Sequence, residues 1–151
     1  MRQRITSVHN ERVKYIRSLG RRRVRQRERR FAVEGTRLAD EVVRAGIKPA
    51  LVLCSEEWSE TPAGRLLLPA LHTAEAGYFL ASNAAMAACA DTVTPQGVLA
   101  VVPFLDLRPR AGLVLVLDRL QDPGNLGTIL RSAEASGVGQ VFLAPGFEER
   151  K

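Results

Sequence analysis

The stretch that decides the fold is LVLVLDRLQDPGNLGTILRSAEASGVGQVFLAPG, which spans Leu113 to Gly146. It opens with five apolar residues at 113–117, a run that is typical of a buried parallel strand. A polar loop with one proline and one glycine follows at 118–124. The stretch therefore begins as a strand whose carboxyl end leads into a loop.

The second half of the stretch predicts a helix and another strand. Residues 125–136 have apolar side chains at helical spacing, and Gly137 and Gly139 are expected to end the helix. Residues 140–144 then predict a strand. The order strand, loop, helix, strand indicates one βαβ unit of a parallel sheet, in which ligands bind at the carboxyl ends of the strands.

The start of the predicted helix is a candidate anion site. Asn125 follows Pro-Gly at the position expected for an N-cap. Helical side chains lean towards the amino end, so Arg131 should extend over Gly127 and lie beside Asn125. A guanidinium, free amide groups and the positive end of a helix would together bind an anionic group such as a phosphodiester. The stripe that should face the sheet consists of Leu126, Ile129, Leu130 and Ala133.

Each of these polar residues also has a purely structural interpretation, and spacing alone leaves both open. Asn125 could serve only as a cap, and Gly127 only as a point of close packing between helix and strand. Arg131 could be a surface partner of Glu134, which is three residues further along the helix.

A dinucleotide-binding loop is a weaker alternative for the same βαβ unit. Gly124 and Gly127 form GxxG, whereas the dinucleotide fingerprint is GxGxxG. Glu148 and Glu149 do follow about 20 residues later, where that fold places the acid that binds the ribose.

Upstream, residues 31–104 predict a small α/β domain in which strands alternate with helices. The expected strands are 31–33, 50–54, 78–81 and 97–104, the second of them as a buried parallel strand. The expected helices are one capped by Thr36 and closed at Gly46, one over 64–75 with a break at Pro69, and one over 84–90 capped by Asn83. Residues 105–111, LDLRPRA, are a predicted linker.

The positive charge of the chain is concentrated at its amino end. Residues 1–30 hold twelve Lys and Arg against two Glu, although the whole chain has a net charge of only +6. Val13, Ile16 and Leu19 predict a short amphipathic helix that Gly20 ends. A basic helical arm beside a mildly acidic body favours a nucleic-acid partner, and a solvated tail is the alternative.

Cysteine usage and hydropathy narrow the class of protein. Cys54 and Cys89 form neither a CxxC motif nor a zinc pattern, so we expect no metal and a reducing compartment. The amino end has no apolar signal region, and no apolar run approaches the roughly 18 residues that cross a bilayer. We therefore expect a cytoplasmic protein without a membrane partner.

Three segments carry a resemblance to a known family. The segment DRLQDPGNLGTILRSAEASG resembles the first motif of the SpoU/TrmH-type RNA ribose 2′-O-methyltransferases of the SPOUT superfamily, whose N-x-G-x-x-x-R pattern is matched by Asn125, Gly127 and Arg131. Upstream, ITSVHNERVKYIRSL, RRFAVEGTRL and TVTPQGVLAVV are similar to the amino-terminal α/β RNA-recognition domain of that family.

The resemblance implies methyl transfer from S-adenosylmethionine to a ribose 2′-hydroxyl of ribosomal or transfer RNA. It implies a catalytic role for Arg131 with Asn125 beside it, a structural role for Gly127 and Glu134 in the motif, and a homodimer. An arginine has a pKa above about 12 and is a poor general base. Arg131 is therefore expected to hold an RNA phosphate and to stabilise the developing alkoxide.

The resemblance also sets the expected domains and the RNA-binding residues. The domains are a basic helical arm at 1–30, an RNA-recognition domain at 31–104, a linker at 105–111 and an incomplete SPOUT domain at 112–151. The expected RNA-binding residues are Arg21, Arg22, Arg23, Arg25, Arg27, Arg29, Arg30 and Arg37.

The predicted catalytic domain departs from the family after its first motif. The second and third motifs build most of the cofactor pocket and the trefoil knot, and in the family they lie downstream of the first. Only FEERK follows Gly146 here. We therefore expect this chain alone neither to bind S-adenosylmethionine tightly nor to methylate RNA. The alternative function is a non-catalytic RNA-binding module that uses the basic arm and the 31–104 domain.

Overall fold

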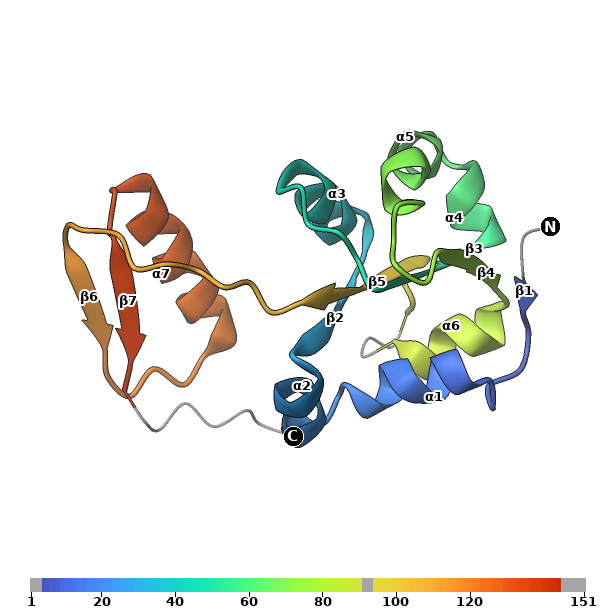
Figure 1. Ribbon diagram of the computed structural model, residues 1–151, viewed down its shortest axis with the longest axis horizontal. Coiled ribbons are helices and arrows are strands. Elements are labelled where there is room, and N and C mark those ends of the chain that lie inside the picture. Colours follow the sequence, from blue (N-terminus) through green and yellow to red (C-terminus); the bar gives the residue numbers. More distant parts are fainter. Residues whose placement is uncertain (1–3, 91–93, 145–151) are drawn as a thin grey trace. The chain divides into compact units, whose positions relative to one another are not determined.

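The computed structural model describes residues 4–90 and 94–144, and the chain forms two compact units, Met1–Leu105 and Asp106–Lys151 (Figure 1). Each unit is described by itself. The alternative role of Glu148 and Glu149 as ribose-binding acids lies outside the described residues.

The first unit is built on a five-stranded mixed sheet with the order β1-β4-β3-β5-β2. Its strands are β1 (Arg4–Ile5), β2 (Arg30–Glu34), β3 (Leu51–Ser55), β4 (Tyr78–Ala81) and β5 (Val98–Pro103). β3 is parallel to β4 and antiparallel to β5, so the prediction of a buried parallel strand holds for only one of its edges. β1 is parallel to β4, and β2 is antiparallel to β5.

Helices cover both faces of this sheet (Figure 1). They are α1 (Glu11–Ser18), α2 (Arg22–Glu28), α3 (Thr36–Arg44), α4 (Glu56–Glu60), α5 (Pro62–Leu71) and α6 (Asn83–Cys89). α1 and α6 pack on one face, and α3, α4 and α5 pack on the other, which gives two separate apolar cores. The predicted α/β class is confirmed as a three-layer sandwich.

The basic amino end is part of this sandwich. Val13, Ile16 and Leu19 are each at most 2% exposed and lie in the same core as Met86 of α6. The predicted amphipathic helix is therefore confirmed, and Gly20 follows its end. α1 belongs to the core of the first unit, while α2 contains no buried residue.

Two of the predicted helix caps in this unit are wrong by one residue. Gly35, at φ +101°, precedes α3, and the Thr36 hydroxyl instead accepts a hydrogen bond from the indole Nε1 of Trp58 at 2.8 Å. Ser82 caps α6 by accepting from the backbone N–H of Ala85 at 3.3 Å, so Asn83 is the first helical residue. At α6 the neighbouring Ser82 is as good a capping residue as Asn83, whereas at α3 the cap position is Gly35, which makes no side-chain hydrogen bond to the helix start.

Around α5 the structure also differs from the prediction. α5 continues through Pro69 to Leu71, because a proline in the last turn removes only one backbone hydrogen bond. α4 precedes it and was not predicted, since five residues are too few to show a helical period. The Ser55 hydroxyl caps α4 by accepting from the backbone N–H of Trp58 at 3.1 Å.

The second unit is the predicted βαβ arrangement. β6 (Val114–Leu117) is parallel to β7 (Gln140–Leu143), and α7 (Pro123–Ala135) connects them. Gly137, at φ +74°, follows the end of α7 as expected. Gly139 lies so close to the preceding linker that an added Cβ would be 2.6 Å from the Arg110 carbonyl oxygen.

The expected burial of the first strand of this unit is wrong. Val114 and Val116 are 45% and 65% exposed, because they alternate outwards from a sheet of only two strands. The helical stripe is also less buried than predicted. Ala133 is buried, but Leu130 is 40% exposed.

No helix within residues 4–90 and 94–144 has the length and apolar character to cross a membrane. Over the same residues, no three His, Cys, Asp or Glu side chains gather in a way that could hold a metal ion.

Candidate functional site

The start of α7 differs from the prediction in one decisive contact. Asp122 is the N-cap, and its Oδ1 accepts a hydrogen bond from the backbone N–H of Asn125 at 2.7 Å. Pro123 takes the first helical position, where its missing N–H costs nothing. Asn125 is therefore a residue of the first turn and not the cap, and its exposed carboxamide is left available for a ligand.

Arg131 reaches back along the helix over Gly127, as its spacing predicts. Its Nη1 lies 3.5 Å from the point that a Cβ on Gly127 would occupy. Its Nη2 donates to the Thr128 hydroxyl at 3.1 Å, and that hydroxyl donates in turn to the Gly124 carbonyl at 3.0 Å. Among the contacts of the described residues, Thr128 and not Glu134 is the partner of Arg131, which leaves the guanidinium exposed but oriented.

The charge at the helix start changes the expected anion site. The Asp122 carboxylate accepts the hydrogen bond of the Asn125 backbone N–H and brings a negative charge to the positive end of the helix. Asp118, in the same loop, pairs with Arg119 at 3.4 Å. An incoming phosphate would therefore depend on the guanidinium of Arg131 more than on free amides of the helix start.

A pocket for the adenosyl group was tested against the described residues of this unit. The unit contains a cavity of about 200 Å³ between the end of α7 and the beginnings of the two strands, lined by Leu130, Gly137 and Val141 among others. Ligand pockets generally measure about 300–1,000 Å³. This cavity is too small for S-adenosylmethionine, and its lining does not include Asn125 or Arg131.

The predicted RNA-binding arginines fall into two groups. Arg21, Arg22 and Arg23 are exposed, and their guanidinium groups have no hydrogen bond or ion pair within residues 4–90 and 94–144. They occupy the cap and the first turn of α2. Three adjacent free cations form the part of the predicted surface that is available to phosphates.

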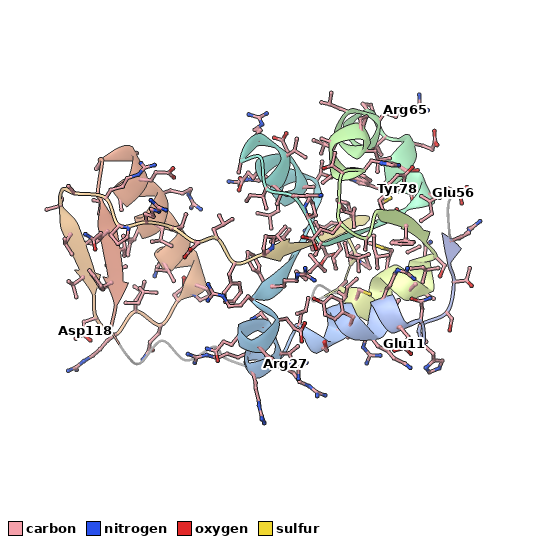
Figure 2. All side chains as sticks on the ribbon, viewed as in Figure 1. Glu11, Arg27, Glu56, Arg65, Tyr78 and Asp118 are labelled. Atoms are coloured by element: carbon pink, nitrogen blue, oxygen red, sulfur yellow. The ribbon has the colours of Figure 1, made fainter. Side chains whose placement is uncertain are left out.

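The other five arginines have partners within the protein. Arg25 donates from Nη1 to the carbonyl oxygens of Leu19 and Gly20, at 3.0 and 2.8 Å. The remaining four are Arg27 paired with Glu28, Arg29 over the ring of Phe104, Arg30 paired with Glu75, and Arg37 paired with Glu41. Figure 2 labels Arg27 on α2. These contacts stabilise the first unit and reduce the cationic surface that composition alone suggests.

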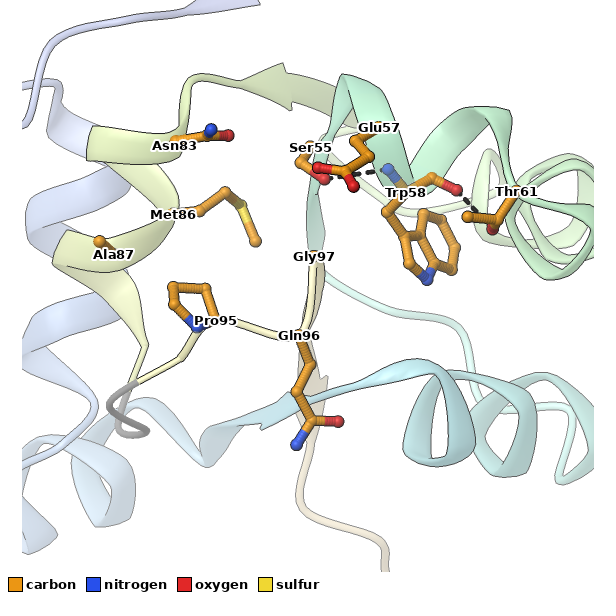
Figure 3. Close-up of a pocket in the computed structure, with 10 residues that line it drawn as sticks. All are labelled: Ser55, Glu57, Trp58, Thr61, Asn83, Met86, Ala87, Pro95, Gln96 and Gly97. Atoms are coloured by element: carbon orange, nitrogen blue, oxygen red, sulfur yellow. Dashed lines mark hydrogen bonds between the residues drawn. The ribbon is translucent and has the colours of Figure 1, made fainter.

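One pocket was missed by sequence reasoning. It has a volume of about 480 Å³ and lies in the first unit between the end of β3, α4, α6 and the segment before β5 (Figure 3). Its residues come from three separate stretches of the sequence, 55–61, 83–87 and 95–97, so no local spacing indicated it. The only sequence signal was the segment TPQG, in which Gln96 and Gly97 line the pocket.

The chain thus combines an α/β sandwich with a βαβ unit whose helix bears the exposed side chains of Asn125 and Arg131. Both parts match known protein families. Residues 10–100 match the MRM3-like substrate binding domain, and residues 112–150 match the SpoU rRNA Methylase family. The chain belongs to the SpoU rRNA methylase family.

Individual relatives agree with this assignment. The chain is 37% identical over 146 residues to an uncharacterised tRNA/rRNA methyltransferase of Synechocystis, covering 92% of this chain and 52% of that protein. It is 32% identical to the 23S rRNA (guanosine(2553)-2′-O)-methyltransferase RlmP of Bacillus subtilis, covering 95% and 55%. The chain thus spans about half the length of the curated relatives that it matches.

Solved structures give the same result. An RNA 2′-O ribose methyltransferase is similar with a TM-score of 0.74 and 32% identity, covering 97% of this chain and 57% of that one. An rRNA methyltransferase from Sinorhizobium meliloti, solved with AdoMet bound, has a TM-score of 0.74 and 28% identity, covering 97% and 56%.

Proposed function

We propose that the protein acts in the 2′-O-methylation of ribose in ribosomal or transfer RNA, with S-adenosylmethionine as methyl donor. The observation that carries the proposal is the placement of Arg131 over Gly127. The exposed Asn125 lies in the first turn of the same helix. The AdoMet-bound relative from Sinorhizobium meliloti supports the choice of donor. When bound, that donor supplies the methyl group.

Arg131 is the residue that we propose to act on the RNA. A guanidinium has donors and no acceptor, so Arg131 does not remove the proton of the 2′-hydroxyl, which passes to water. It can bind the neighbouring phosphate through two N–H groups and stabilise negative charge on the 2′-oxygen as that charge develops. Thr128 limits its rotation by accepting one hydrogen bond at 3.1 Å. Asn125 can then orient the ribose through its free carboxamide.

The test is transfer of a labelled methyl group to ribosomal RNA, with the 151-residue chain compared with any longer product of the same reading frame. We expect activity only in the longer product, because the cavity of about 200 Å³ between α7 and the strands is too small for the cofactor. In that product Arg131→Ala should lower turnover by about 100-fold or more, the usual cost of removing one preorganised donor. Arg108→Ala, which removes an exposed arginine of the same unit, is the matched control. Unchanged turnover in Arg131→Ala would refute the assignment.

A second candidate function is that of a non-catalytic RNA-binding module. The free guanidinium groups of Arg21, Arg22 and Arg23 favour it, since they can bind phosphates without any catalytic group. Each phosphate contact contributes roughly 0.7 to 0.9 to the slope of log K against log salt. The triple alanine variant should therefore lower that slope by about 2 to 3, whereas Arg37→Ala should change it little because Arg37 already pairs with Glu41.

The two functions are separated by combining these variants. If Arg131→Ala abolishes methylation and keeps RNA affinity, the enzyme proposal stands. If no form of the protein transfers methyl groups while RNA affinity stays sensitive to salt, the binding module is the better description. A homodimer and a cytoplasmic location are further proposals from the family resemblance, and sedimentation of the protein with and without RNA tests the first.

A further inference from the structure

The 480 Å³ cavity of the first unit has a rigid apolar side (Figure 3). Trp58 is 6% exposed, and its indole Nε1 donates to the Thr36 hydroxyl at 2.8 Å. Gly97 packs so closely against Trp58 that a Cβ added to Gly97 would lie 2.8 Å from the Cβ of Trp58. Met86 and Pro95 complete the apolar surface. These contacts fix the side chains before any ligand arrives.

Two separate segments position Gln96 at the same cavity. The Glu34 carboxylate accepts a hydrogen bond from the backbone N–H of Gln96 at 2.9 Å. The backbone N–H of Gly35 donates to the Val98 carbonyl at 2.9 Å, and a side chain on Gly35 would collide with the side-chain oxygen of Gln96. The Glu-Gly pair after β2 and the Gln-Gly pair before β5 therefore act together to hold the backbone of Gln96 at the cavity, while its side chain extends past Gly35 (Figure 3).

The polar groups at the rim select the chemistry of a ligand. Glu57, Asn83 and Gln96 line the cavity, and within the described part of the chain their side chains have no hydrogen-bond or ion-pair partner. No lysine or arginine is among the residues that line it. A carboxylate without a cation repels phosphate but accepts hydrogen bonds from amino and ring N–H groups. The Asn83 carboxamide can both donate and accept.

We propose that this cavity binds one unpaired nucleobase of the RNA and prefers a base with an exocyclic amino group. The base would lie against the apolar side formed by Trp58, Met86 and Pro95, and its amino group would donate to Glu57. Single-stranded bases are recognised in this way, by apolar contact on their faces and by hydrogen bonds on their edges. Uracil has no amino group and is disfavoured. The inference rests on the proposed function, since it takes RNA to be the substrate.

Binding can be measured on the 151-residue chain with single nucleosides, which lack the phosphates that the free arginines would attract. Trp58 is the only tryptophan, so its indole N–H gives one NMR signal that reports on the cavity. Guanosine, adenosine or cytidine should shift this signal in a saturable way, and uridine should bind at least about tenfold more weakly, as expected for the loss of one good base-edge contact. Equal binding of uridine overturns the preference.

Two pairs of variants locate the site. Glu57→Gln should weaken the amino-bearing nucleosides about tenfold or more, and Glu60→Gln, on the same helix but away from the cavity, should not. Ala87→Leu should block the cavity, whereas Ala84→Leu, equally exposed on α6, should leave binding intact. All four positions are exposed, and the Trp58 signal shows directly that each variant is folded.

The outcomes separate this inference from the proposed function. If no nucleoside binds, or if Glu57→Gln and Ala87→Leu behave like their controls, the nucleobase pocket is refuted, while RNA binding through Arg21, Arg22 and Arg23 can still be measured. If the protein binds no RNA at all, the proposed function fails whatever the nucleosides do.

Discussion

Replacing Gly97 with alanine tests how closely the start of β5 packs against Trp58. Gly97 has φ +82°, and an added Cβ would lie 2.8 Å from the Cβ of Trp58 and 3.2 Å from the hydroxyl oxygen of Ser55. The left-handed backbone costs a residue with a side chain about 1–2 kcal/mol. Overpacking a well-filled core typically adds about 1–3 kcal/mol. We therefore expect Gly97→Ala to lower the free energy of unfolding by about 2–5 kcal/mol.

Gly77→Ala is the matched control for the cost of placing a side chain on a left-handed backbone. Gly77 has φ +78°, but an added Cβ would meet nothing within 4 Å. The difference between the two variants isolates the steric cost, which we expect to be about 1–3 kcal/mol. Urea unfolding followed by fluorescence measures it, because the single tryptophan, Trp58, reports on the first unit only. Equal destabilisation by both variants would refute the close packing of Gly97 on Trp58.

Two further predictions concern buried groups of the same unit. Thr36→Val should lower the free energy of unfolding by about 1–3 kcal/mol, because it leaves the buried indole N–H of Trp58 without an acceptor. Thr73→Val, which removes an exposed hydroxyl, should lower it less. Urea unfolding compares the two variants. Burial raises the pKa of the Cys89 thiol to about 11, although the charge of Arg17 opposes the shift. Between about pH 9 and 11 the unfolded thiol ionises and the folded one does not, so stability should fall as pH rises, and Cys89→Ala should flatten that fall in unfolding curves measured across this range.

The spacing and runs of apolar residues correctly predicted the buried helix α1 and the buried strands β3 and β5. The helical spacing of Val13, Ile16 and Leu19 indicated α1, and all three are buried. Continuous apolar runs indicated β3 and β5, whose residues are almost all buried. The same reasoning failed for Val114 and Val116, because the burial of a strand depends on what covers its second face. Only α7 covers the two-stranded sheet of the second unit within residues 106–144.

At the start of α7, sequence patterns likewise failed to predict which residue caps the helix. Asn125 is a good capping residue by type, but Asp122 stands in front of Pro123 and reaches the same helix start. Which of the two residues caps the helix depends on where the first helical residue lies. Pro123 is the first helical residue, so the cap is Asp122, three residues upstream of Asn125. The predicted direction of the Arg131 side chain over Gly127 is confirmed, because it depended only on how helical side chains lean.

The basic surface could not be predicted from composition because the partners of its arginines are distant in sequence. Arg30 pairs with Glu75, which is 45 residues away, and their contact exists only because the sandwich brings β2 near the segment after α5. Arg25 is likewise occupied by carbonyl oxygens at the end of α1. The ion pair with Glu75 offsets the charge of Arg30, and the two carbonyl oxygens use hydrogen-bond donors of Arg25 that a phosphate would otherwise accept from. The electrostatic part of RNA affinity should therefore follow the free arginines at 21–23 more closely than the net charge of residues 1–30.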